Sequence, residues 1–124
     1  PEAFAASQLK DWADNFDGRE QLAIKKYAEA LEIIPLTIAE NAGMDPIDTM
    51  ATLRAKQNQG QKWTGIDAKN TKIADMMAIN VVEPIAVKEQ IIKSATEAAC
   101  MILRIDDVIA VSGGPGGGGM PPMG

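Results

Sequence analysis

Two predicted helices meet at the stretch Asn41-Ala42-Gly43-Met44-Asp45-Pro46-Ile47-Asp48. Gly43 suits the left-handed conformation that ends many helices, because it has no Cβ to clash with the backbone. Asp45 is a preferred N-cap, and Pro46 fits the first position of a helix, where its missing N–H is not needed. The stretch therefore predicts that one helix ends near residue 42 and that a second begins at residue 46.

Upstream of this junction, apolar residues recur with helical spacing. They predict one helix over residues 2–15 and a second over 19–42, separated by the helix-breaking pair Asp17-Gly18. Pro35 falls inside the second helix and is expected to kink it, because its ring removes a donor and clashes with the preceding turn. Trp12 is interpreted as a core anchor, as is Trp63 further along the chain.

Downstream, residues 62–73 change character. β-formers such as Trp63, Thr64 and Ile73 surround a polar segment, and this pattern predicts a short β-hairpin. Residues 74–79 are expected to form a short helix that ends at Asn80, a residue that tolerates the left-handed conformation.

The last predicted helix begins at Pro84 and extends to about Arg104. Residues 108–111, Val-Ile-Ala-Val, then indicate a strand, which would need a partner because a lone strand cannot satisfy its own backbone groups. The predicted fold class is therefore mainly α: a helical bundle with a small β-hairpin and a C-terminal edge strand.

Composition limits the function classes. The 124 residues carry 12 basic and 17 acidic side chains, a net charge of −5 that disfavours binding to nucleic acid. There is no histidine and a single cysteine, so we expect no metal site in this chain. The sequence shows neither an apolar run long enough to span a membrane nor an export signal at Pro1, which favours a cytoplasmic protein.

Glycine is unevenly distributed. Residues 112–124 hold seven of the 11 glycines and no charge, and they predict a disordered Gly/Pro/Met tail behind a body formed by residues 1–111.

Glu83 is the residue whose chemistry is least explained by folding. It stands immediately before Pro84 at a helix start, although glutamate is not a preferred N-cap. Its carboxylate could accept hydrogen bonds from a ligand's hydroxyl groups, or it could be a solvated acid near the positive end of the helix dipole. Lys88 lies five positions later and off the same helical stripe, so a local ion pair is not expected.

Several ordered segments resemble the C-terminal part of a group II chaperonin subunit of the archaeal thermosome type. The Gly/Pro/Met tail is also similar to thermosome tails. The segments are Arg19-Glu20-Gln21-Leu22-Ala23-Ile24, Glu40-Asn41-Ala42-Gly43-Met44-Asp45-Pro46-Ile47-Asp48, Val82-Glu83-Pro84, Ser94-Ala95-Thr96-Glu97-Ala98-Ala99 and Ile102-Leu103-Arg104-Ile105-Asp106-Asp107-Val108-Ile109.

This resemblance implies that residues 1–111 are the C-terminal part of an equatorial ATP-binding domain. Glu83 would then face the ribose of ATP or ADP, and Lys88 would lie near the adenine or ribose. Ile66, Asp67 and Ala68 would approach the base, and Gly43 would sit beside the pocket. The segment Lys69-Asn70-Thr71-Lys72 departs from the Thr-Gly turn that is frequent in the family, which puts these hairpin contacts in doubt.

The resemblance also implies partners and an activity. Chaperonin subunits assemble into a double ring, and they hydrolyse ATP with magnesium to enclose unfolded client proteins. The strand near Val108 would join an inter-subunit sheet, and the tail would project into the ring cavity. The family's phosphate loop, magnesium ligand and catalytic aspartates are absent from this sequence, so the chain alone is not expected to be an ATPase. The alternative is a non-enzymatic helical module for oligomerisation or protein interaction, assembling through its terminal strand.

Overall fold

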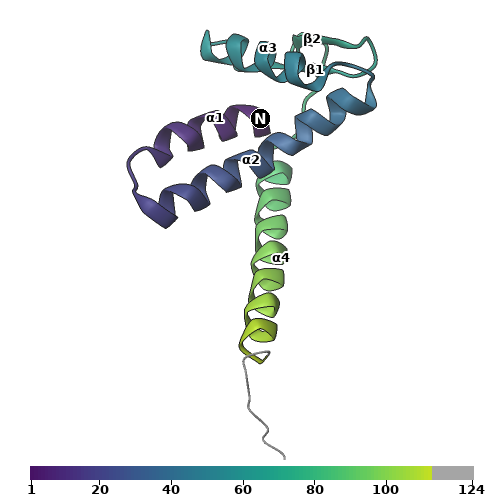
Figure 1. The fold of residues 1–124 in the computed structure, drawn as a ribbon. Coiled ribbons are helices and arrows are strands. Elements are labelled where there is room, and N and C mark those ends of the chain that lie inside the picture. The colour runs from purple at the N-terminus through teal and green to yellow at the C-terminus, as the bar shows by residue number, and fades with distance from the viewer. Residues whose placement is uncertain (113–124) are drawn as a thin grey trace, which may run out of the picture. The chain divides into compact units, whose positions relative to one another are not determined.

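The computed structural model describes the backbone of residues 1–112 and the side chains of residues 1–105. This part of the chain is mainly helical with one small sheet (Figure 1). In chain order its elements are α1 (Glu2–Ala13), α2 (Gly18–Asn41), α3 (Pro46–Asn58), β1 (Thr64–Asp67), β2 (Lys72–Asp75) and α4 (Ile85–Ser112). The chain divides into two compact units, of which the first is Pro1–Val82 and the second begins at Glu83. The predicted mainly α fold with a β-hairpin is confirmed.

α1 and α2 form an antiparallel helix pair in the first unit (Figure 1). Small side chains allow the two helices to approach closely: Ala6, Ala13 and Ala28 are fully buried. Pro35 lies inside α2, which continues through it as one helix. The first unit therefore begins as a helical hairpin whose contact surface consists largely of alanine.

α3 completes the apolar core of this unit. Met50 and Leu53 on α3 are buried against Ala3 of α1, and Leu36 of α2 packs against the same cluster. The two tryptophans lie outside this core: Trp12 is 52% exposed and Trp63 is 51% exposed. Their prediction as core anchors is therefore wrong. Short side chains fill the contact between α1 and α2 and leave no room there for the indole of Trp12, and Trp63 lies in the turn before β1.

The junction between α2 and α3 has the predicted geometry. Gly43 adopts a left-handed φ of 77° just after α2. Asp45 is the N-cap of α3, and its Oδ1 accepts hydrogen bonds from the backbone N–H groups of Ile47 at 2.9 Å and Asp48 at 3.0 Å. Both predictions are confirmed, since each depended only on residues within the junction.

β1 and β2 form the predicted antiparallel hairpin, with Thr64 opposite Asp75 and Asp67 opposite Lys72. Gly65 sits opposite Ala74. A Cβ added to Gly65 would lie 2.6 Å from Cγ of Met76, so the Met76 side chain covers the space that a larger residue would need.

The short helix predicted at residues 74–79 does not form. Instead β2 continues to Asp75 and a series of turns follows. Asp75 Oδ1 accepts hydrogen bonds from the N–H groups of Met77 at 2.9 Å and Ala78 at 3.1 Å, and these local bonds stabilise a turn in place of a helix. Asn80 has the expected left-handed conformation, with a φ of 57°.

α4 is longer than predicted. It continues through Val108–Val111, so the predicted C-terminal edge strand is wrong. A helix satisfies its backbone N–H and C=O groups internally, whereas a strand here would have needed a partner. Of the predicted tail, residues 112–124, the described part includes only Ser112, the last residue of α4; the other residues lie outside it. None of the helices in the described residues is both long and apolar enough to cross a membrane.

Candidate functional site

Glu83 and Lys88 come together at the start of α4. The Lys88 Nζ lies 3.2 Å from Glu83 Oε2, and the two side chains are 29% and 42% exposed respectively. Our expectation that no local ion pair forms is therefore wrong. The rule of helical stripes holds for two residues within a helix, but Glu83 precedes α4, so its carboxylate is free of that periodicity and meets a lysine of the first helical turns.

This pair has the chemistry to bind hydroxyl groups. An ionised carboxylate offers about four acceptor positions, and the ion pair with Lys88 uses only part of that capacity. Because both groups are partly exposed, the ion pair itself adds little to folding stability. The arrangement therefore leaves acceptor positions of the carboxylate open, where a vicinal diol could donate two hydrogen bonds to it.

The three hairpin residues predicted to approach a base are in different surroundings. Asp67 is buried, and its Oδ1 and Oδ2 accept hydrogen bonds from Asn70 N at 3.1 Å and Asn70 Nδ2 at 2.7 Å. The side-chain hydrogen bond from Asn70, followed by the backbone one, lowers the pKa of Asp67. Ile66 packs against the core, whereas Ala68 is exposed in the turn. Asp67 therefore shapes the turn, and of the three residues only Ala68 offers an open surface to a ligand.

Gly43 is explained by backbone conformation. Its N–H donates a hydrogen bond to the carbonyl oxygen of Glu40 at 3.0 Å, at the end of α2. A Cβ built on Gly43 would meet no atom within 4 Å. Glycine is therefore required here by the φ of 77°, and not by a close contact with a neighbouring atom. Of the six predicted site residues, Glu83 and Lys88 form an ion pair in the second unit. In the first unit, Ile66, Asp67 and Ala68 are neighbours along the hairpin, and Gly43 follows α2.

A magnesium ion has no ligand set in this part of the molecule. Among the described residues, no three Asp, Glu or Cys side chains lie close enough together to hold a metal ion.

Comparison with known proteins identifies the family. The model of the TCP-1/cpn60 chaperonin family matches residues 1–112. The chain belongs to the TCP-1/cpn60 chaperonin family.

Thermosome subunits are among the relatives of this chaperonin chain. It is 52% identical to thermosome subunit beta of Archaeoglobus fulgidus, with 99% of the chain and 24% of that protein covered. It is 58% identical to a thermosome subunit of Methanopyrus kandleri, with 89% of the chain and 20% of that protein covered. The chain thus spans about a quarter of the length of these curated relatives or less.

A solved structure agrees with this assignment. The fold is similar to that of the open-state monomer of a group II chaperonin from Methanococcoides burtonii, with a TM-score of 0.80 and 46% identity. The match covers 83% of this chain and 26% of that one. The resemblance to group II chaperonins of the thermosome type is confirmed.

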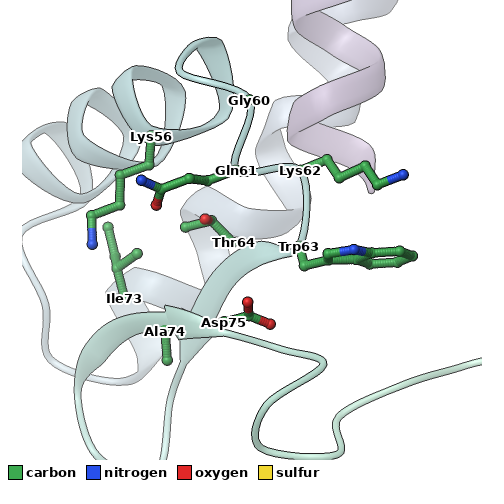
Figure 2. Close-up of a pocket in the computed structure, with 9 residues that line it drawn as sticks. All are labelled: Lys56, Gly60, Gln61, Lys62, Trp63, Thr64, Ile73, Ala74 and Asp75. Carbon is green, nitrogen blue, oxygen red and sulfur yellow. The ribbon is translucent and has the colours of Figure 1, made fainter.

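One further site in the chaperonin chain was not predicted from the sequence. A cavity of about 610 Å³ lies between the C-terminal end of α3 and the base of the β-hairpin (Figure 2). We call it the lysine cavity, because Lys56 and Lys62 are among its lining residues, together with Trp63 and Ile73. The concentration of basic residues between positions 54 and 72 was the available sequence signal.

Proposed function

We propose that this chain is the C-terminal part of the equatorial domain of a group II chaperonin subunit. The proposal is carried by the family match over residues 1–112, together with thermosome relatives about four to five times longer than the chain. The complete subunit would act in the cytoplasm as an ATP-dependent chaperone. It would assemble with other subunits into a double ring that encloses unfolded proteins.

Within that subunit, we assign the ribose side of the nucleotide site to Glu83. The supporting observation is the carboxylate held by Lys88 at 3.2 Å and still 42% exposed, a state in which it can accept hydrogen bonds from the ribose hydroxyls of ATP or ADP. Lys88 fixes the carboxylate and lies near the adenine or ribose. Ala68 would offer its exposed surface to the base, while Ile66 and Asp67 hold the turn in shape and Gly43 ends α2 beside the pocket.

Bound ATP would supply a phosphoanhydride for hydrolysis, and the groups that act on it belong to other segments of the subunit. The proposed share of this chain is recognition of the nucleoside. The alternative of a non-enzymatic module would have to assemble through a surface other than a terminal strand, because residues 108–111 are helical.

A grafted subunit tests the ribose assignment. In it, this chain replaces the matching segment of thermosome subunit beta of Archaeoglobus fulgidus, and calorimetry compares the dissociation constants of ADP and 2′,3′-dideoxy-ADP. The unmodified graft should bind ADP about ten- to a hundredfold more tightly, because hydrogen bonds to a charged acceptor are lost with the hydroxyls. Glu83→Ala should bind both nucleotides alike.

Glu89→Ala is the matched control, since Glu89 is an exposed acid in the first turns of α4, the helix that follows Glu83. It should keep the preference for ADP. Size-exclusion chromatography of each variant establishes that the ring is intact. If Glu83→Ala in an intact ring kept the full preference for ADP over the dideoxy nucleotide, the ribose role would be wrong.

A further inference from the structure

Charge is concentrated in one segment of this acidic chain. Residues 54–72 hold five of the 12 basic side chains and only one of the 17 acidic ones, so five minus one gives a local charge of +4. The whole chain has a net charge of −5. This segment covers the end of α3, the loop that follows it, and the hairpin up to the first residue of β2. Its charge is thus opposite to that of the chain as a whole.

Four of the five basic groups in this segment are not neutralised by an acid at ion-pair distance. Arg54 is the exception, because its guanidinium binds Glu32 Oε2 at 2.7 Å. Within the described residues, no carboxylate lies within 4.0 Å of the ammonium groups of the four lysines, Lys56, Lys62, Lys69 and Lys72. The single acid of the segment, Asp67, accepts two hydrogen bonds from Asn70. Lys72 lies opposite Asp67 in the hairpin and helps to lower the pKa of that carboxyl, so the charge available to a partner is that of Lys56, Lys62 and Lys69.

Two of these lysines line the lysine cavity. Figure 2 shows Lys56 and Gln61 on one side, above Ile73, and Lys62 and Trp63 extending together on the other. The Lys62 Nζ lies 5.1 Å from the centroid of the Trp63 ring, and this indole is 51% exposed. Cationic and apolar side chains thus both line a cavity whose volume of about 610 Å³ can take several side chains.

A hydrogen bond between α3 and the hairpin supports one wall of the cavity. Thr64 at the start of β1 is buried, and its carbonyl oxygen accepts a hydrogen bond from Nε2 of the buried Gln57 at 3.2 Å. This bond ties α3 to the hairpin, so the two elements that form the cavity are held together before any partner arrives. Little ordering of the backbone would be required on binding.

We propose that the lysine cavity binds an acidic segment of a partner polypeptide. Carboxylates of that segment pair with Lys56 and Lys62, and an apolar side chain packs against Trp63 and Ile73. A polyphosphate or nucleic acid fits less well, because the apolar wall would face a fully charged chain and Asp75 adds a carboxylate to the lining. This proposal does not rest on the ribose contact assigned to Glu83.

Tryptophan fluorescence of the full chain tests this proposal. Trp12→Phe leaves Trp63 as the sole indole, because the chain has two tryptophans. The probe is a blocked pentapeptide of four glutamates around a central leucine, and the control peptide has lysines in place of the glutamates. We expect a saturable change with the glutamate peptide that weakens as salt is raised, and none with the lysine peptide.

Substitutions then locate the site. Lys56→Gln and Lys62→Gln should each weaken binding of the glutamate peptide about two- to fivefold, as expected for partly exposed ion pairs. Lys26→Gln is the matched control, since Lys26 is an exposed lysine of α2 that does not line the cavity, and it should leave binding unchanged. Circular dichroism establishes that each variant is folded.

Three results would overturn the proposal. The two peptides could produce equal responses, or both cavity substitutions could leave the affinity of the glutamate peptide unchanged. Tripolyphosphate could also bind with a saturable fluorescence change under conditions in which the glutamate peptide does not, which would identify a phosphate site in place of a peptide site.

Discussion

Two charged regions share helix α3 and differ in what surrounds them. Arg54 contributes to the Glu32 cluster, in which Glu32 binds Arg54 through Oε2 and the Lys10 Nζ through Oε1 at 2.9 Å. Glu32 is 9% exposed, and the cluster links α1, α2 and α3. Lys56 lies two residues after Arg54 on the same helix, and it lines the lysine cavity with no carboxylate of the described residues within 4.0 Å of its ammonium group. One charge is therefore used inside the fold, and the other is available at its surface.

The geometry of a helix explains this difference. Two residues two positions apart point about 200° away from each other around the axis, so Arg54 and Lys56 lie on opposite sides of α3. The buried side chains of Leu53 and Gln57 lie between them, on the face of α3 that packs into the fold. We infer that the face of α3 with Arg54 contributes to stability, whereas the face with Lys56 is available for binding. The three predictions below test that division.

Breaking the Glu32 cluster should have the largest effect. Glu32→Ala leaves two cations without their shared acceptor, and we expect the free energy of unfolding to fall by about 2 kcal/mol, reduced from the value for fully buried pairs because Lys10 and Arg54 are partly exposed. Urea unfolding measures this loss. Glu29→Ala, which removes an exposed pair with Lys26 on the same helix, should cost less than about 0.5 kcal/mol. Equal losses for the two variants would contradict a structural role of the cluster.

Removing the one acid of the basic segment should have a smaller effect that depends on pH. The pKa of Asp67 is lowered in the folded chain, so its ionised form contributes stability above the ordinary aspartate pKa, and this contribution is lost as pH falls through the lowered value. Asp67→Asn should therefore be less stable than the unmodified chain near neutral pH, and the difference should shrink in acid. Urea unfolding at several pH values gives the comparison; a difference that stayed constant from neutral to acid pH would rule out the charge of Asp67 as the cause.

Neutralising the lysine cavity should have the smallest effect on stability. The double variant Lys56→Gln, Lys62→Gln breaks no ion pair in the described residues, so we expect the free energy of unfolding to change by less than about 0.5 kcal/mol. Thermal unfolding by circular dichroism measures it. A loss as large as that of Glu32→Ala would show that these lysines belong to the fold and would end the contrast between the two faces of α3.

Local signals in the sequence predicted local structure well. The turn at Gly43 and the N-cap at Asp45 depend on backbone strain and on hydrogen bonds within a few residues, and both were predicted. The choice between strand and helix at the end of the chain was harder to predict from the sequence. The β-branched residues of 108–111 favoured a strand, but the continuous hydrogen bonding of α4 decided the outcome. Local propensity is therefore overridden where a neighbouring element already satisfies the backbone.

The candidate site was predictable in its residue types and less so in its contacts. Glu83 was selected because glutamate is unusual before a helix-starting proline, yet its ion pair with Lys88 was missed because a rule for helical residues was applied across a helix boundary. The lysine cavity was missed because Lys56 and Lys62 become neighbours of Ile73 only when the hairpin folds back toward α3. Contacts of that kind depend on tertiary packing, which spacing along the chain does not encode.

The contact between Gly65 and Met76 has a consequence for how this sequence can change over time. Because a Cβ at position 65 would lie 2.6 Å from Met76 Cγ, alanine at this position requires methionine to move or to be replaced by a smaller residue. Substitutions at the two positions are therefore coupled: a larger side chain at position 65 requires a smaller or displaced side chain at position 76. Among chaperonin sequences, a residue larger than glycine at position 65 should accompany a smaller or differently shaped residue at position 76, and the order in which the two changes arise should matter.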